Sequence, residues 1–173
     1  MFKIKNRIIS NNHQPFIIAE LSGNHNGSLS NALKLIDIAA KCKVDAVKLQ
    51  TFKANTITMK SNQKEFFIKD KKNIWKNQSL YKLYNKAHTP WEWHEQIFKR
   101  AKKKNIMIFS SPFDETAVDF LETLKVPAYK IASFEINHFP LLKRVAKTKK
   151  PVILSTGLAS YSDIKNAIKF LKK

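Results

Sequence analysis

Hydrophobic residues follow two spacings along the chain, and the two spacings alternate five times. Short apolar runs predict buried strands at 16–20, 45–50, 106–110, 128–132 and 152–154. After each run, apolar residues recur three and four positions apart, which is typical of an amphipathic helix. The predicted helices lie near 29–40, 89–101, 114–124, 138–147 and 160–171. A strand-helix alternation of this kind indicates parallel strands with helices packed outside them.

Residues that favour helix starts precede these segments. Before the second helix, Thr89 is predicted to be the N-cap, Pro90 to occupy the first helical position and Glu92 to close a capping box. The other predicted caps are Ser28 or Ser30, Asp114, and Ser160 together with Asp163. Pro140 lies in the first turn of the helix near 138–147, where proline is tolerated.

Two segments stand outside the strand-helix repeat. Residues 2–9 are predicted to form short strands or a hairpin arm ahead of the first buried strand. Residues 51–88 form a long insertion after the second strand. It carries the aromatic residues Phe66, Phe67, Trp75, Tyr81 and Tyr84. Because the insertion follows the carboxyl end of a strand, we expect its aromatic side chains to cover a substrate.

The number of strand-helix units leaves two architectures open. A (β/α)₈ barrel requires eight units, whereas this chain of 173 residues supplies about five. The sheet is therefore either open or part of an incomplete barrel, and in both cases an edge strand on each side lacks a partner. The pattern alone does not decide between them.

The net charge of +19 arises from 32 basic and 13 acidic residues. Such a charge can indicate a nucleic acid or an anionic membrane as partner. Here, however, only three basic residues are arginine, and the lysines are scattered over every segment rather than gathered in one arm. We therefore interpret the charge as a lysine-rich surface, predict neither a nucleic-acid nor a membrane partner, and note that it could attract an anionic small substrate.

Features of the sequence favour a cytoplasmic protein. The first residues alternate apolar and basic side chains and lack the continuous apolar core of a secretory signal. No apolar run approaches the length needed to span a membrane. The single cysteine, Cys42, cannot form an internal disulfide, which agrees with a reducing compartment.

Charged side chains occur within the predicted buried strands. Glu20 lies at the carboxyl end of the first strand, which is where active sites sit in barrel and doubly wound folds. Lys48 and Gln50 share one face of the second strand, and Lys130 lies inside the fourth. Two lysines could fall there by chance in so lysine-rich a chain, or could extend to a rim. The cost of burying unpaired charge favours a function, namely binding of a phosphate or carboxylate.

Serine residues follow the same strands. Ser111, Ser133 and Ser155 stand at the ends of the third, fourth and fifth strands, and together they are typical of a phosphate-binding ring. Among the histidines, His25 is a plausible site residue because it follows Glu20 in a loop, whereas the others are interpreted as surface or structural residues. No metal site with recognisable spacing is found.

Six motifs, in this order, resemble the nonulosonate (sialic acid) synthase family. They are Phe-Ile-Ile-Ala-Glu at 16–20, Asn-His-Asn-Gly at 24–27, Val-Lys-Leu-Gln-Thr at 47–51, Ser-Ser-Pro-Phe at 110–113, Pro-Ala-Tyr-Lys-Ile-Ala-Ser at 127–133 and Leu-Ser-Thr-Gly at 154–157. Segments 87–94 and 111–116 are similar to the branch of the family that makes pseudaminic acid.

The resemblance implies a (β/α)₈ barrel that condenses phosphoenolpyruvate with an open-chain 2,4-diacetamido-2,4,6-trideoxy-hexose, giving pseudaminic acid and phosphate. It implies that Glu20 handles the proton of the attacking water or stabilises a cationic centre. It implies that Gln50 and Glu135 face the sugar. The residues expected to hold phosphoenolpyruvate are Lys48, Lys130, Ser111, Ser133 and Ser155.

The resemblance also implies components that this chain does not supply. A divalent metal, Mn²⁺ or Mg²⁺, would polarise the aldehyde, but the family's metal-binding histidines and its C-terminal antifreeze-like domain correspond to positions beyond residue 173. Residues 1–173 are thus predicted to be the N-terminal part of the barrel domain of a homodimeric enzyme, and to be inactive alone. The alternatives are an N-acetylneuraminate or legionaminate synthase, or a truncated remnant that only binds anions.

Overall fold

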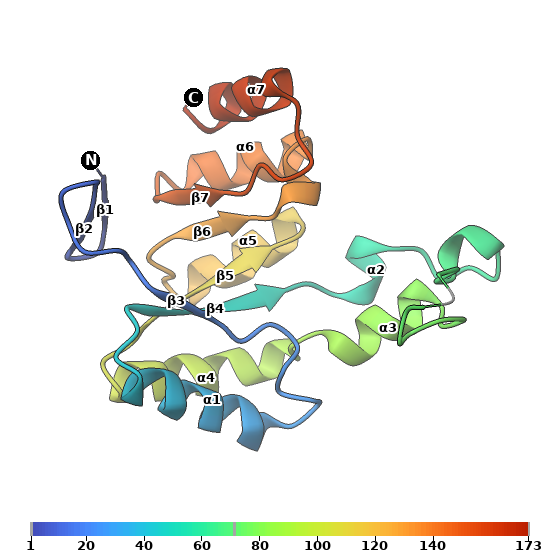
Figure 1. The fold of residues 1–173 in the computed structure, drawn as a ribbon, viewed down its shortest axis with the longest axis horizontal. Coiled ribbons are helices and arrows are strands. Elements are labelled where there is room, and N and C mark those ends of the chain that lie inside the picture. Colours follow the sequence, from blue (N-terminus) through green and yellow to red (C-terminus); the bar gives the residue numbers. More distant parts are fainter. Residues whose placement is uncertain (1, 71, 173) are drawn as a thin grey trace.

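A parallel sheet forms the centre of the computed structural model, which describes residues 2–70 and 72–172. Within these residues five strands run parallel in the order β3-β4-β5-β6-β7, so each strand lies beside its neighbours in sequence (Figure 1). The strands are β3 (Ile18–Glu20), β4 (Ala46–Thr51), β5 (Met107–Pro112), β6 (Tyr129–Ile131) and β7 (Val152–Leu154). The five predicted strands are confirmed, with ends that shift by up to two residues.

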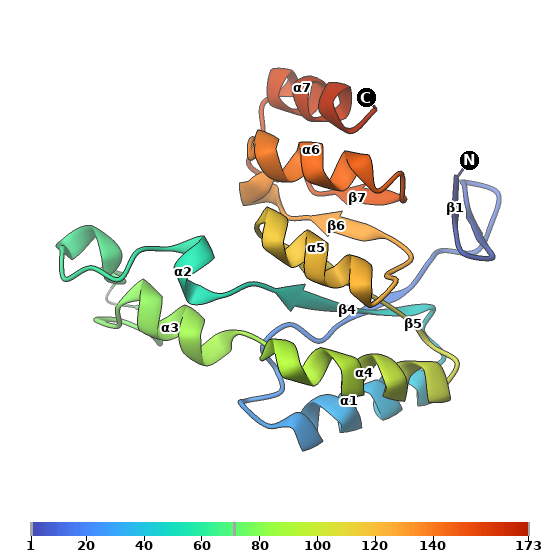
Figure 2. The ribbon, with the colours of Figure 1, turned by 180° about the vertical axis from the view of Figure 1, so that it is seen from behind.

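Helices connect the strands and, apart from α2 and α3 in the insertion after β4, lie on one side of the sheet, as Figure 2 shows for α4, α5 and α6. They are α1 (Leu29–Lys41), α2 (Ala54–Ile57), α3 (Leu80–Ala87), α4 (Trp91–Lys103), α5 (Glu115–Thr123), α6 (Phe139–Lys147) and α7 (Tyr161–Leu171). Two short 3₁₀ turns, η1 (Lys64–Phe66) and η2 (Ser133–Glu135), complete the set. Each sheet strand is therefore followed by at least one helix, giving the predicted five βα units.

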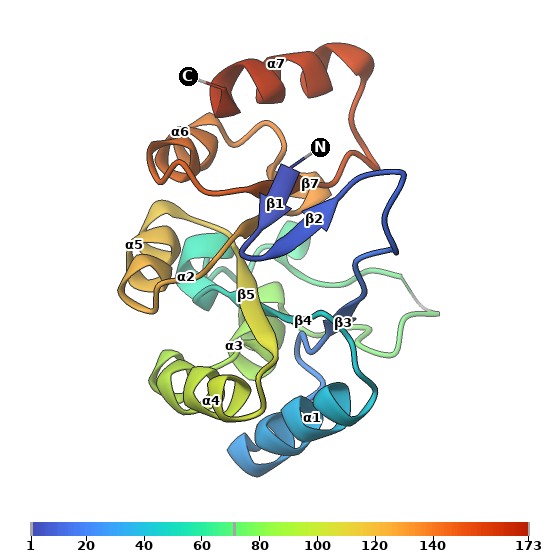
Figure 3. The same ribbon diagram turned by 90° about the vertical axis from the view of Figure 1, so that its left-hand side faces the viewer.

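The sheet curves, and its helices surround the convex side (Figure 3). Val47 and Leu49 of β4 pack with α1 and α4 in one apolar cluster, whereas Tyr129 and Ile131 of β6 belong to a second cluster with α5, α6 and α7. Because side chains alternate along a strand, the residues between them face the concave side. β3 and β7 end the sheet without a further strand partner among the described residues, as predicted for an incomplete barrel.

An antiparallel hairpin precedes the sheet, as the sequence predicted. It consists of β1 (Phe2–Ile4) and β2 (Arg7–Ile9). Ile4 is fully buried, and the Arg7 guanidinium lies 2.8 Å from the carboxylate of Asp45, which immediately precedes β4. The hairpin therefore sits at the amino ends of the strands, opposite the ends where the predicted site residues lie (Figure 1).

The insertion after β4 forms an arm that carries α2, η1 and α3. It continues outward from the carboxyl end of β4 (Figures 1 and 2). At its base, the ring of Phe52 contacts the rings of Tyr84 and Phe113, with centroids 6.0 and 5.3 Å away. Farther out, Ile74 and Trp75 are exposed. The expectation that the aromatic residues of the arm cover a substrate stays a prediction.

Most predicted helix caps are confirmed, and one is wrong. Ser28, Asp114 and Ser160 cap α1, α5 and α7, and Ser160 shares its capping box with Asp163. Thr89 does not cap α4, because Pro90 is the N-cap and no side chain caps that helix. The predictions that Pro90 occupies the first helical position and that Glu92 closes a capping box are therefore also wrong. The hydroxyl of Thr89 is instead hydrogen-bonded to the buried His25.

The Asp114 cap offers a direct test of local stability. Its Oδ1 accepts hydrogen bonds from the backbone N–H groups of Thr116 and Ala117, at 2.8 and 3.1 Å. Asp114→Ala is expected to lower the free energy of unfolding by about 1–2 kcal/mol, because these donors lose their partner. Asp114→Asn keeps the acceptor and should lose less in the same urea titration. Equal losses in the two variants would contradict a capping role.

Among the described residues, no helix combines the length and apolar character that crossing a bilayer requires.

Candidate active site

An ion pair joins the carboxyl ends of β3 and β4. Glu20 and Lys48 are register partners, and the Lys48 ammonium lies 2.7 Å from a Glu20 carboxylate oxygen. The same ammonium donates a hydrogen bond to the Ser111 hydroxyl on β5 at 3.4 Å. The Lys48 side chain is only 5% exposed, whereas that of Glu20 is 54% exposed. Three neighbouring strands thus hold one buried cation, with a carboxylate that faces solvent beside it.

A second lysine lies close to this group on the concave side. The pKa of Lys130 is lowered, first by burial and then by repulsion from Lys48, while Glu20 and Glu135 oppose the shift. No ion pair of Lys130 occurs within residues 2–70 and 72–172. Lys130 therefore has a cationic group whose charge is incompletely compensated, which suits it to bind an anion.

Glu135 contributes the second carboxyl group of the site. Burial raises its pKa, and attraction to Lys130 opposes that change. Its Oε2 is buried and lacks a hydrogen-bond partner in the described part of the chain. A buried acceptor without a partner is costly, so this oxygen is suited to a ligand hydroxyl or amide.

The other three predicted residues occupy the same edge of the sheet. Gln50 is the register partner of Ser111. Ser155 follows β7, and its backbone N–H donates to the Ile131 carbonyl at 3.0 Å. Ser133 lies near Gly157, because a Cβ added to that glycine would be 3.9 Å from the Ser133 Cβ. The structure thus brings all eight predicted residues to the carboxyl ends of the strands, although their roles stay predictions.

His25, which the sequence singled out as a plausible site residue, is fully buried. Its Nδ1 accepts from the Gly27 N–H at 3.1 Å, so Nε2 carries the proton and donates to the Thr89 hydroxyl at 3.3 Å. Its ring stands edge-on to Trp93. His25 therefore fixes the loop after Glu20 onto the start of α4, and the structure supports a structural role.

Sequence reasoning missed a buried polar network on the opposite face of the strands. His94 Nδ1 donates to the Pro90 carbonyl at 3.1 Å, so Nε2 accepts from the Thr51 hydroxyl at 2.9 Å. Thr51 in turn accepts from the Ser110 hydroxyl at 2.7 Å. All three side chains are fully buried, and burial lowers the pKa of His94 to about 4.

This network joins the residues next to two site positions. Thr51 follows Gln50, and Ser110 precedes Ser111. The network therefore links the ends of β4 and β5 on the face opposite the proposed site. The signal in the sequence is a hydroxyl on a face that is otherwise apolar, since Thr51 continues the alternation of Val47 and Leu49.

The described residues do not supply a metal site. No group of three or more His, Cys, Asp or Glu side chains in residues 2–70 and 72–172 is arranged to hold an ion. Glu20 is engaged with Lys48, and His25 and His94 are bound to protein groups on both ring nitrogens. The described residues by themselves therefore do not supply the ligand set that Mn²⁺ or Mg²⁺ prefers.

Comparison with known proteins identifies relatives that match most of the chain. The NeuB family model matches residues 35–173. The pseudaminic acid synthase of Campylobacter jejuni is 48% identical over 149 residues, which cover 86% of this chain and 43% of that protein. The N,N'-diacetyllegionaminic acid synthase of the same species is 41% identical over 158 residues, covering 91% of this chain and 46% of that protein.

A solved structure agrees with these relatives. The spore coat polysaccharide biosynthesis protein SpsE of Bacillus subtilis superposes with a TM-score of 0.78 at 35% identity, over 99% of this chain and 44% of that chain. The predicted fold, an incomplete barrel of the (β/α)₈ type, is thereby confirmed. The chain spans less than half the length of the relatives it matches. The resemblance seen in the sequence is confirmed, and the chain belongs to the NeuB family.

Proposed function

We propose that this chain supplies the phosphoenolpyruvate-binding half of a pseudaminic acid synthase. In the reaction, the methylene carbon of phosphoenolpyruvate forms a bond to the aldehyde carbon of an open-chain 2,4-diacetamido-2,4,6-trideoxy-altrose. Water then adds to the cationic carbon that results, and the bond to phosphate breaks. The observation that carries the proposal is the Lys48 ammonium, held at the strand ends by Glu20 and Ser111.

The two lysines are proposed to bind the anionic groups of phosphoenolpyruvate. Lys48 is fixed in position by its two partners, whereas Lys130 is close by and has no carboxylate within ion-pair distance in the described residues. Phosphate and carboxylate oxygens are the acceptors that charged donors bind most strongly. Ser111, Ser133 and Ser155 would donate or accept further hydrogen bonds along the same strand ends.

The carboxyl groups are proposed to act on the other reactants. Glu20 forms an ion pair with Lys48 and is accessible, so its carboxylate can accept a proton from the attacking water or stabilise the cationic carbon. Glu135, whose pKa is raised and whose Oε2 lacks a partner in the described residues, would face the sugar together with Gln50. The metal that the family resemblance implies, the homodimer and the cytoplasmic location stay predictions.

The second candidate function is the synthesis of legionaminic acid. The legionaminic acid synthase of C. jejuni is 41% identical to this chain, against 48% for its pseudaminic acid synthase. The product is therefore best assigned by offering both sugars to one protein. The same assay tests the prediction that the 173-residue chain is inactive alone.

The test uses this chain alone and a chimera that joins it to the C-terminal part of C. jejuni pseudaminic acid synthase. Phosphate release is measured with phosphoenolpyruvate, Mn²⁺ and, in turn, the altrose-type sugar, the legionaminic acid precursor and N-acetylmannosamine. We expect release by the chimera with the altrose-type sugar only, and none by the chain alone. Turnover by the chain alone would contradict its incompleteness, and a preference for another sugar would overturn the assigned product.

A further inference from the structure

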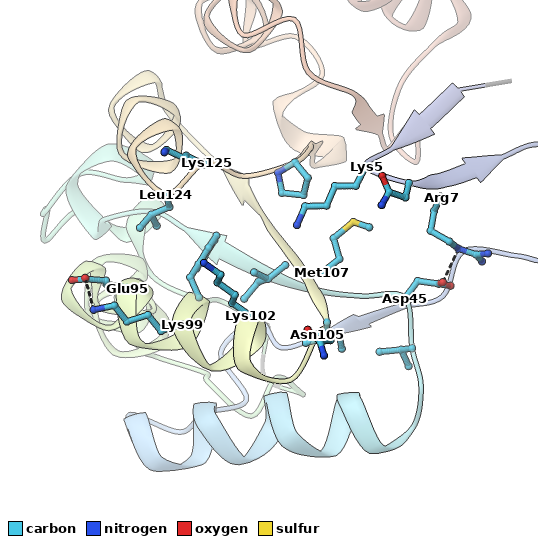
Figure 4. Close-up of a pocket in the computed structure, with 16 residues that line it drawn as sticks. Lys5, Arg7, Asp45, Glu95, Lys99, Lys102, Asn105, Met107, Leu124 and Lys125 are labelled. Atoms are coloured by element: carbon cyan, nitrogen blue, oxygen red, sulfur yellow. Dashed lines mark ion pairs between the residues drawn. The ribbon is translucent and has the colours of Figure 1, made fainter.

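A large cavity lies at the amino ends of the strands, opposite the proposed active site. Its volume is about 710 Å³, within the range of small-molecule sites. The hairpin contributes Lys5 to Arg7, α4 contributes one wall, and the start of β5 together with the segments before β5 and β6 contributes the floor (Figure 4). The cavity is partly open to solvent, and all the residues that line it belong to the described part of the chain.

The charges around the cavity are unbalanced. Five cationic and two acidic side chains line it, and each acid is already paired with a cation. Arg7 pairs with Asp45 at 2.8 Å, and Lys99 pairs with Glu95 at 2.7 Å. The remaining cations, Lys5, Lys102 and Lys125, have no carboxylate partner within residues 2–70 and 72–172. In Figure 4, Lys5 and Lys102 extend from two different elements toward the middle of the cavity.

The floor of the cavity is apolar. Phe98, Met107, Ile108, Leu124 and Pro127 line it beneath the lysines. Inorganic phosphate would leave these side chains uncovered, whereas a purely apolar ligand would leave the lysines without a counter-ion. The combination fits a ligand with an anionic group at one end and a planar or apolar body at the other.

We propose that this cavity is a second ligand site, separate from the strand ends, which binds a nucleoside phosphate. Lys5 and Lys102 hold the phosphate, and the base and sugar lie over Met107 and Phe98. The ligand lies at the opposite ends of the strands from Lys48 and Glu20, so it does not compete with phosphoenolpyruvate for the same groups. The proposal does not depend on the assigned reaction.

Methyl NMR of the unmodified protein can test the proposal directly. Labelled methionine methyl groups report on the cavity through Met107 and on the arm through Met59, which is an internal control. Titration with AMP or UMP is expected to shift the Met107 signal in a saturable way and to leave Met59 unchanged. Adenosine alone and inorganic phosphate alone should each bind more weakly, and phosphoenolpyruvate should not displace AMP.

A matched pair of variants separates local binding from overall charge. Lys5→Gln with Lys102→Gln removes two cavity cations, whereas Lys3→Gln with Lys103→Gln removes two neighbours that do not line the cavity. The first variant is expected to weaken AMP binding at least about tenfold, and the second is expected to leave it unchanged.

Several results would overturn the proposal. One is a Met107 signal that does not respond to either nucleotide in the unmodified protein, a result that no folding defect of a variant can produce. Another is equal weakening in both double variants, which would assign binding to the general positive charge. Displacement of AMP by phosphoenolpyruvate would place the nucleotide at the strand ends instead.

Discussion

Replacing Lys48 with Met is expected to lower the affinity of the chain for phosphoenolpyruvate about 100-fold, because a charged hydrogen bond to the ligand contributes about 1.5–3 kcal/mol. Lys48 is 5% exposed and is positioned by Glu20 and Ser111, so its ammonium is already fixed where the ligand is proposed to bind. Isothermal titration calorimetry with phosphoenolpyruvate measures the change.

Lys34→Met is the matched control for this substitution. It removes the same charge from an exposed position on α1 and should leave the affinity unchanged. An equal loss in the two variants would show that the overall positive charge, rather than Lys48, attracts the ligand.

The ion pair also predicts an asymmetry in stability. Lys48→Met removes the buried charge and leaves Glu20 in water, so the free energy of unfolding should change by less than about 1 kcal/mol. Glu20→Gln leaves the buried ammonium without its counter-ion and should cost about 2 kcal/mol. Urea titration of both variants measures the difference; a larger loss for Lys48→Met would contradict this account of the pair.

The second large effect is a loss of stability in acid through His94. Its pKa is about 4 in the folded chain, below its ordinary value of 6.5, because it is buried. The unfolded chain therefore binds a proton before the folded chain does, so stability is complete above the unfolded pKa and falls as the pH decreases toward the folded value. Between about pH 7 and pH 5 the free energy of unfolding should fall by about 2 kcal/mol from this residue.

His94→Gln separates this contribution from those of other groups. The glutamine does not titrate, and its side chain can still hydrogen-bond to Thr51, so the free energy of unfolding should depend less steeply on pH between those values. The slope is compared rather than the absolute stability, since the substitution itself disturbs a buried site. His25, whose pKa is lowered by burial and by His88, contributes in the same direction in both proteins. Identical slopes would show that His94 is not the titrating group.

The elements of this fold could be predicted because their signals are local. Apolar spacing located all five sheet strands, and Asp114 and Ser160 cap their helices as the sequence indicated. The prediction that Thr89 caps α4 was wrong, because a hydroxyl before a helix can hydrogen-bond either to the helix N–H groups or to a distant partner. In the folded chain, the loop after Glu20 brings His25 within hydrogen-bonding distance of Thr89. That approach requires Gly23, where an added Cβ would lie 3.0 Å from the Ala87 carbonyl oxygen.

The site was predicted in part for the same reason. Lys48 and Lys130 were conspicuous because a cation inside a parallel strand violates the apolar pattern. The network of Thr51, Ser110 and His94 was missed because a hydroxyl at a strand end is unremarkable until its partner is known. The cavity was also missed, since its walls come from the hairpin, α4 and the segments beside β5, which are far apart in the chain.

The sequence by itself determined the five βα units, the family and the residues that meet at the strand ends, because strand periodicity and parallel topology suffice to place them on one edge. The tertiary structure decided which groups pair and which do not. Glu20 and Ser111 share Lys48, Lys130 is left without an ion pair in the described residues, and His94 is locked as a neutral ring. These outcomes depend on distances and burial between segments that no local pattern encodes.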